Sequence, residues 1–173
     1  MTTRKSILLG AAVVGGAVLW YVFRPDTLFV NRSVSEPFPV MDAPATEHSA
    51  MLAAAAEPVP LTSGRFHTNA HETNGMATIY RLPDGRRVLR LTEFATSNGP
   101  DVRVYLVAAD DVQDEDAAKS AGFVDLGALK GNVGDQNYDV PADLDLSRYR
   151  AVSIWCRCFS VNFGAAPLLD ATS

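Results

Sequence analysis

The sequence predicts an all-β protein: an antiparallel β-sandwich domain preceded by one N-terminal transmembrane helix and a proline-rich tether. Three observations support this. Short runs of alternating apolar and polar residues, separated by turn residues, fill residues 61–170. Residues 7–23 form an apolar run without charge, and six prolines interrupt residues 25–60. We therefore expect a cytoplasmic N-terminus over 1–5, a membrane span over 6–24, a linker over 25–60 and the domain over 61–170.

The apolar run near the N-terminus has the features of an uncleaved signal anchor. At 1.5 Å per helical residue, residues 7–23 span about 25 Å, the short end of what crosses a bilayer core. Arg4 and Lys5 precede the run, so the N-terminus is expected inside and the rest of the chain outside the cytoplasm. A cleaved signal peptide is the alternative, although bulky residues stand where a small-residue cleavage site would follow.

Residues 25–60 are expected to tether the domain to the membrane. Prolines along this stretch prevent long regular elements. An alanine-rich segment favours one short helix over residues 46–57.

Each strand of the domain is predicted from alternation and turn residues. Residues 76–82 and 86–94 flank Pro83-Asp-Gly85 and are expected to pair as a hairpin. Residues 101–107 alternate, with Val102, Val104 and Leu106 on one face and Arg103 and Tyr105 on the other. The remaining runs are residues 122–127, 138–140 and a C-terminal strand pair after Pro141. The acidic run 110–116 predicts a solvated turn or the start of a short helix, and the glycine-rich segment 130–136 predicts a turn.

The segment Ala151–Gly164 reads as a buried strand that carries both cysteines of the protein, Cys156 and Cys158. Residues two apart on a strand share a face, so the two thiols are expected side by side, with Cβ atoms about 6.5–7 Å apart. A disulfide needs about 3.5–4.5 Å, so two free thiols are expected, and the alternative, a disulfide, requires a bend of the strand. The alternation of apolar and polar residues shifts by one position around Arg157. This shift predicts either a β-bulge there or two short strands joined by a corner.

The domain resembles the DM-thirteen family, an extracellular module often found beside DOMON domains. The motifs of the resemblance are, in chain order, Gly64-Arg-Phe66, His71, Gly75-Met-Ala-Thr-Ile-Tyr80, Asp84-Gly-Arg-Arg-Val-Leu-Arg-Leu91, Phe94-Ala-Thr-Ser-Asn-Gly-Pro-Asp101, Val104-Tyr-Leu106, Leu126-Gly-Ala-Leu-Lys-Gly-Asn132, Asn137-Tyr138, Pro141, Trp155-Cys156, Phe159 and Phe163-Gly-Ala-Ala166.

The resemblance implies extracytoplasmic electron transfer through a cysteine, acting as a bare thiol or as the ligand of a bound group such as haem. Cys156 stands at that position and Trp155 is expected to pack beside it; Cys158 is an addition to the family pattern. The implied role is a redox or electron-transfer module, exchanging electrons with a protein partner, rather than a stand-alone enzyme. The alternative is a non-enzymatic binding or adhesion module, because free cysteine is often a small core hydrophobe.

His67 and His71 are candidate metal ligands, and His71 is also a candidate cofactor ligand. Together with Cys156 and Met76 they would form a copper-like set, but nothing in the sequence brings these groups together. Charge excludes other classes: residues 61–173 carry 11 Lys and Arg against 15 Asp and Glu, which argues against nucleic acid and against lying on anionic lipid. No serine–histidine–acid group or carboxylate pair indicates a hydrolase.

Overall fold

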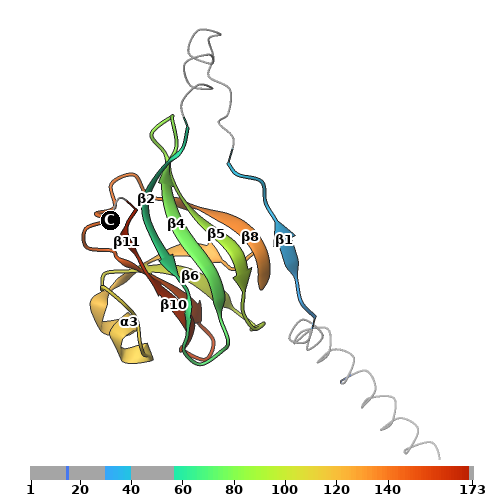
Figure 1. The fold of residues 1–173 in the computed structure, drawn as a ribbon. Coiled ribbons are helices and arrows are strands. Elements are labelled where there is room, and N and C mark those ends of the chain that lie inside the picture. The colour runs from blue at the N-terminus through green and yellow to red at the C-terminus, as the bar shows by residue number, and fades with distance from the viewer. Residues whose placement is uncertain (1–14, 16–29, 40–56, 172–173) are drawn as a thin grey trace, which may run out of the picture. The chain divides into compact units, whose positions relative to one another are not determined.

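Two β-sheets form the domain in the computed structural model, which describes residues 15, 30–39 and 57–171 (Figure 1). The six-stranded sheet has the strand order β1 (Ser33–Ser35), β8 (Val133–Val140), β5 (Arg87–Ala95), β4 (Asn74–Arg81), β2 (Val59–Arg65) and β11 (Leu169–Asp170). The five-stranded sheet has the order β3 (His67–Thr68), β10 (Val161–Pro167), β9 (Ala151–Cys156), β6 (Val102–Val107) and β7 (Phe123–Ala128). The prediction of an all-β fold is confirmed.

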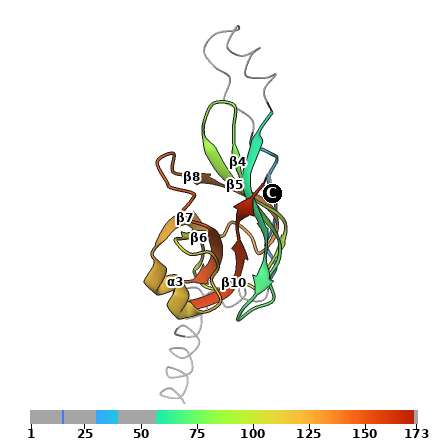
Figure 2. The same ribbon diagram turned by 60° about the vertical axis from the view of Figure 1, so that its left-hand side comes forward.

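The main hydrophobic core lies between the two sheets. Ile79, Leu89 and Leu91 contribute from the six-stranded sheet, and Val104 and Ile154 from the five-stranded sheet. Figure 2 shows the two layers, with α3 (Glu115–Ala121) on the side of the five-stranded sheet. The domain thus buries apolar side chains from both inner faces, as expected of a sandwich.

A second, smaller core lies on the outer face of the five-stranded sheet. Tyr105, Val107 and Trp155 pack there with Ala118 of α3. Helix α3 begins where Asp114 caps it: the carboxylate accepts a 2.7 Å hydrogen bond from the Ala117 N–H. The acidic run therefore starts a short helix, one of its two predicted forms. Because of this second core, all six residues of β9 are buried.

The predicted hairpin is confirmed as β4 and β5. The two strands are antiparallel, and the Leu82 N–H donates to the Arg86 carbonyl across the turn at 2.8 Å. Gly85 has φ +87°, a left-handed conformation that glycine adopts without strain. Among the strand pairs of the described residues, only β1 with β8 is parallel.

Residues 33–39 belong to the domain, although the sequence assigned them to the linker. Strand β1 pairs with β8, and the Glu36 carboxylate accepts hydrogen bonds from Lys130 Nζ at 2.8 Å and the Asn137 N–H at 2.7 Å. The Phe38 ring lies edge-on to the Tyr80 ring, with the two ring centroids 5.0 Å apart. An edge strand presents unpaired backbone groups, and β1 satisfies those of β8.

The glycine-rich segment 130–136 also differs from its prediction as a turn, because β8 begins within it at Val133. Gly134 has φ +102°, and a Cβ there would lie 2.0 Å from the Val34 carbonyl oxygen. Glycine is therefore required for β1 to approach the sheet.

The predicted membrane anchor over residues 6–24 lies outside the described residues, apart from Gly15. The predicted helix over 46–57 also lies outside them, apart from Glu57. Within residues 30–39 and 57–171, no helix has the length and hydrophobicity needed to cross a membrane.

Candidate functional site

Cys156 is the last residue of β9 and is fully buried. Its side chain belongs to the main core, on the same face as Val152 and Ile154. Its neighbours across the sheet are Val102 on β6 and Val161 on β10. Because the thiol has no solvent exposure, a partner molecule cannot touch it unless this end of the sandwich opens.

Trp155 does not pack beside Cys156, so that prediction is wrong. Consecutive strand residues point to opposite faces. The indole therefore lies in the outer core, where it stacks on Tyr105 with ring centroids 6.3 Å apart and Lys119 Nζ lies 5.8 Å from the ring centroid. The two residues are adjacent in the chain but separated by the thickness of the sheet.

Cys158 is exposed, and it does not share a strand face with Cys156. Strand β9 ends at Cys156, and residues 157–160 form the turn into β10. The parity argument that placed the thiols side by side fails because it applies only within a strand. The change of parity is thus explained by two short strands joined by a corner, the second of the two predicted arrangements. Both cysteines are free thiols.

A β-bulge does occur nearby, but in β10. Asn162 pairs with Trp155 and Gly164 pairs with Ile154, so Phe163 is the extra residue. The bulge changes the parity of the strand, and Phe163 is buried in the main core.

The turn that carries Cys158 is attached to the start of β6 through Arg157. The Arg157 N–H donates to the Asp101 carbonyl at 2.9 Å, and its Nε donates to Asp101 Oδ2 at 2.7 Å. Ser160, at the end of the turn, has φ +54°, the left-handed conformation that reverses the chain. The contacts of Arg157 therefore fix the start of the turn that carries Cys158.

His67 forms a pair with an acidic side chain. Its Nε2 donates a hydrogen bond to Asp111 Oδ1 at 2.8 Å. Two residues on, the Asn69 side-chain amide donates to the Val112 carbonyl at 2.8 Å. These bonds hold the loop before α3 against β3, so His67 has a structural partner already.

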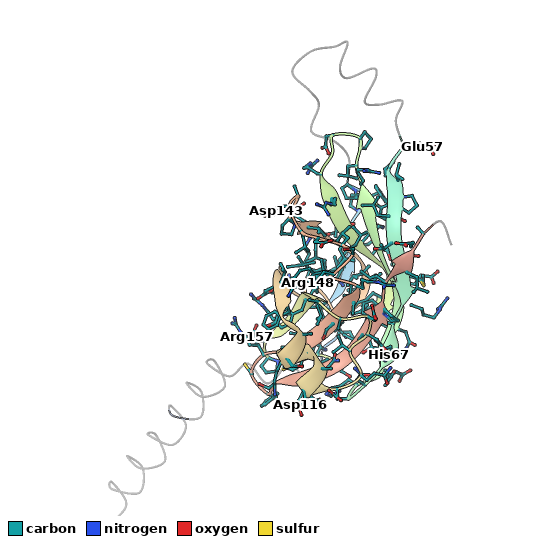
Figure 3. The ribbon with its side chains drawn as sticks, turned by 90° about the vertical axis from the view of Figure 1, so that its left-hand side faces the viewer. Glu57, His67, Asp116, Asp143, Arg148 and Arg157 are labelled. Atoms are coloured by element: carbon teal, nitrogen blue, oxygen red, sulfur yellow. The ribbon has the colours of Figure 1, made fainter. Side chains whose placement is uncertain are left out.

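His71 contacts an aromatic ring. Its imidazole lies on Phe163 with centroids 4.0 Å apart, and its backbone N–H donates to the Phe163 carbonyl at 3.1 Å. Figure 3 shows His67 and Arg157 at opposite edges of the domain. Among the described residues, Cys156 and the two histidines do not form one group of ligands. Within the described ranges, no three His, Cys, Asp or Glu side chains are grouped so that they could hold a metal ion.

A haem ligated by Cys156 does not fit this fold. Such a group needs an open cavity at the sulfur, wide enough for a large planar ring. The Cys156 side chain instead lies in a core that both sheets fill, between Val102 and Val161. The residues around this thiol are those of a close-packed interior.

Asp111 provides a test of the His67 pair. Partial burial by itself raises the pKa of Asp111, but hydrogen bonds from His67, Gln113 and the Val112 N–H outweigh it and hold the pKa below its ordinary value of 3.8. A carboxylate with a lowered pKa stabilises the fold above its unfolded-state pKa and loses this contribution as pH falls through the folded-state value.

We therefore expect Asp111→Asn to be less stable than the wild type at pH 5, and we expect the difference to shrink as the pH falls below 3.8 and through the lowered pKa of Asp111. Urea unfolding of both proteins at a series of pH values measures this. A stability difference that stays constant over the series would contradict the role given to the Asp111 carboxylate.

A surface pocket of about 230 Å³ lies on the outer side of the five-stranded sheet. It is lined by side chains that the sequence did not single out as a site, together with Trp155: Tyr105, Lys119, Phe123, Arg157 and Ser160. One feature of the sequence pointed to this pocket: in the alternation of residues 101–107, Tyr105 lies on the face opposite Val102 and Val104. The register between strands β7, β6 and β9, which brings these rings together, cannot be read from that alternation.

Comparison with known proteins gives a family and no individual relative. No curated protein and no solved structure matches the chain. The model of the family described as "Electron transfer DM13" matches residues 65–168, which contain β3 to β10, both cysteines and both histidines discussed above. The chain therefore belongs to the electron transfer DM13 family.

Proposed function

We propose that this DM13 domain is an electron-transfer module held on the outer side of a membrane by its N-terminal segment, with Cys156 as its redox centre. One observation carries the proposal: at the end of β9, an exposed thiol at Cys158 follows the buried thiol of Cys156 by two residues. The exposed thiol is the point of contact for a partner, and the buried thiol completes the redox couple. This is an arrangement typical of redox-active cysteines.

The turn makes pairing of the two sulfurs geometrically feasible. Two successive trans peptides separate the Cα atoms of Cys156 and Cys158 by at most about 7.2 Å, and a bend shortens this distance into the range of about 4.4–6.8 Å found in disulfides. Pairing requires the Cys156 side chain or the turn to rotate, because one thiol faces the core. A disulfide in so small a ring is strained and readily reduced.

The reaction is a two-electron exchange with a partner disulfide. The Cys158 sulfur attacks one sulfur of the partner, forming a mixed disulfide and releasing the first partner thiol. The Cys156 sulfur then attacks the Cys158 sulfur and releases the second. Two cysteine thiols become one disulfide, and their two protons and two electrons are transferred to the partner disulfide, which becomes two thiols.

A titration with a chromogenic aromatic disulfide tests the proposal on the native full chain. The wild type is expected to release two equivalents of reagent thiol, to lose two hydrogens by mass spectrometry and to retain no reagent. Cys156→Ser is expected to release one equivalent and to retain the reagent on Cys158. Cys158→Ser is expected to react only after unfolding. Cys156→Ala serves as a second variant where the buried serine hydroxyl impairs folding.

The second candidate is a binding or adhesion module in which Cys156 is only a core residue. The observation that favours it is the complete burial of Cys156 among apolar side chains. In that case the native wild type would release one equivalent, retain the reagent on Cys158 and leave Cys156 unreacted. This result would overturn the redox proposal.

The membrane attachment is supported by the uncharged run 7–23 and the positive residues before it. We expect the full chain to remain with membranes in alkaline carbonate and the domain to be digested when protease is added outside intact cells. Release by carbonate, or protection from the protease, would contradict this part of the proposal.

A further inference from the structure

Three aromatic side chains from neighbouring strands form one apolar surface on the outer side of the five-stranded sheet. Tyr105 of β6 stacks on Phe123 of β7, with ring centroids 4.2 Å apart and an angle of 11° between the ring planes. It also stacks on Trp155 of β9, with ring centroids 6.3 Å apart and an interplanar angle of 23°. Tyr105 and Trp155 are almost fully buried, whereas Phe123 is 46% exposed. Together they line the pocket of about 230 Å³.

Two cationic side chains border the same pocket. Lys119, on α3, has its Nζ 5.8 Å from the Trp155 ring centroid and forms no ion pair with another described residue. Arg157, in the β9–β10 turn, is 58% exposed while Asp101 holds its Nε at 2.7 Å. In Figure 3, Arg157 lies on the same side of the domain as Asp116 of α3. An acidic group above the aromatic surface would thus meet the Lys119 ammonium and, at the border of the pocket, the Arg157 guanidinium that Asp101 pairs.

We propose that this pocket binds a planar aromatic molecule of one or two fused rings that carries an acidic group. Its ring would pack against Phe123, the exposed ring of the three, and its acidic group would lie beside Lys119, with Arg157 at the border of the pocket. The size agrees, since a cavity of about 150 Å³ holds benzene and this pocket is larger. The site uses no cysteine side chain, so binding to the reduced protein does not require the thiol couple proposed above.

Titration of the native full chain with 2-naphthoate, followed by calorimetry and by amide NMR shifts, tests the inference. We expect saturable one-to-one binding with shifts at Lys119 and in residues 157–160. Phe123→Ala is expected to weaken binding about tenfold, because it removes a stacking ring. Lys119→Gln is expected to weaken it about two- to fivefold, and to leave binding of uncharged 2-naphthamide unchanged.

Phe159→Ala is the matched control, because Phe159 is 70% exposed in the adjacent turn and does not line the pocket. Its affinity for 2-naphthoate is expected to equal that of the wild type, and thermal melting verifies that each variant is folded. Absence of saturable binding, or equal affinity in folded Phe123→Ala, would overturn the inference. Cys156→Ser and Cys158→Ser are expected to bind normally, so failure of the thiol proposal and failure of this one give different results.

Discussion

Replacing Phe94 by alanine is expected to lower the free energy of unfolding by about 3–5 kcal/mol. The Phe94 side chain is among the largest that are fully buried, and its ring lies edge-on to Phe66 with centroids 5.2 Å apart. Alanine would remove the transfer free energy of the ring and leave a cavity between the sheets. Since small domains are stable by about 5–15 kcal/mol, the loss is a large fraction of the total.

Urea unfolding followed by circular dichroism measures this effect, with Phe159→Ala as the matched control. Phe159 has the same side chain but is 70% exposed, so its replacement is expected to change the free energy of unfolding by less than about 0.5 kcal/mol. Equal losses for the two variants would contradict the placement of Phe94 in the core.

Gln136→Leu is expected to cost about 2–5 kcal/mol, although leucine has nearly the volume of glutamine. The fully buried Gln136 side chain accepts hydrogen bonds from the Lys130 N–H at 3.1 Å and the Tyr138 hydroxyl at 2.7 Å. It donates to the Gly131 carbonyl at 2.9 Å. Burial raises the pKa of Tyr138, so its hydroxyl stays protonated as the donor. Leucine would leave several of these groups without their partner.

The control for this prediction is Gln113→Leu, because Gln113 is exposed and donates only to the Asp111 carboxylate among the described residues. Its replacement is expected to cost less than about 1 kcal/mol. Both variants are compared by urea unfolding at neutral pH. If Gln136→Leu proved as stable as Gln113→Leu, the hydrogen bonds of Gln136 would contribute nothing net to the fold.

Phe94 also shows where the alternation of residues along a strand no longer predicts which side chains face the core. Leu89 and Leu91, at odd-numbered positions, face the core, yet Phe94, at an even-numbered position, also faces it. The register of β5 against β8 shifts between Leu91 and Ala95, and Glu93 has φ +50°. The alternation predicted the strand, but the bulge that turns Phe94 inward depends on the neighbouring strand.

The domain boundary shows the same limit. Prolines near β1 predicted a linker, and locally this is reasonable because Ser33–Ser35 has no apolar pattern of its own. Its place comes from β8, about a hundred residues later in the chain, through backbone pairing and the Lys130–Glu36 ion pair. Contacts between such distant segments leave no local signal in one sequence.

Alternation and turn residues were sufficient for the all-β fold, the β4–β5 hairpin and the inward face of β6, because these follow from properties of consecutive residues. The environments of the two cysteines were not determined in this way. Where β9 ends, how the turn exposes Cys158, and which rings meet Trp155 depend on the pairing of β9 with β6 and β10 and on α3. Packing between distant segments therefore decided which thiol is accessible and where the aromatic pocket lies.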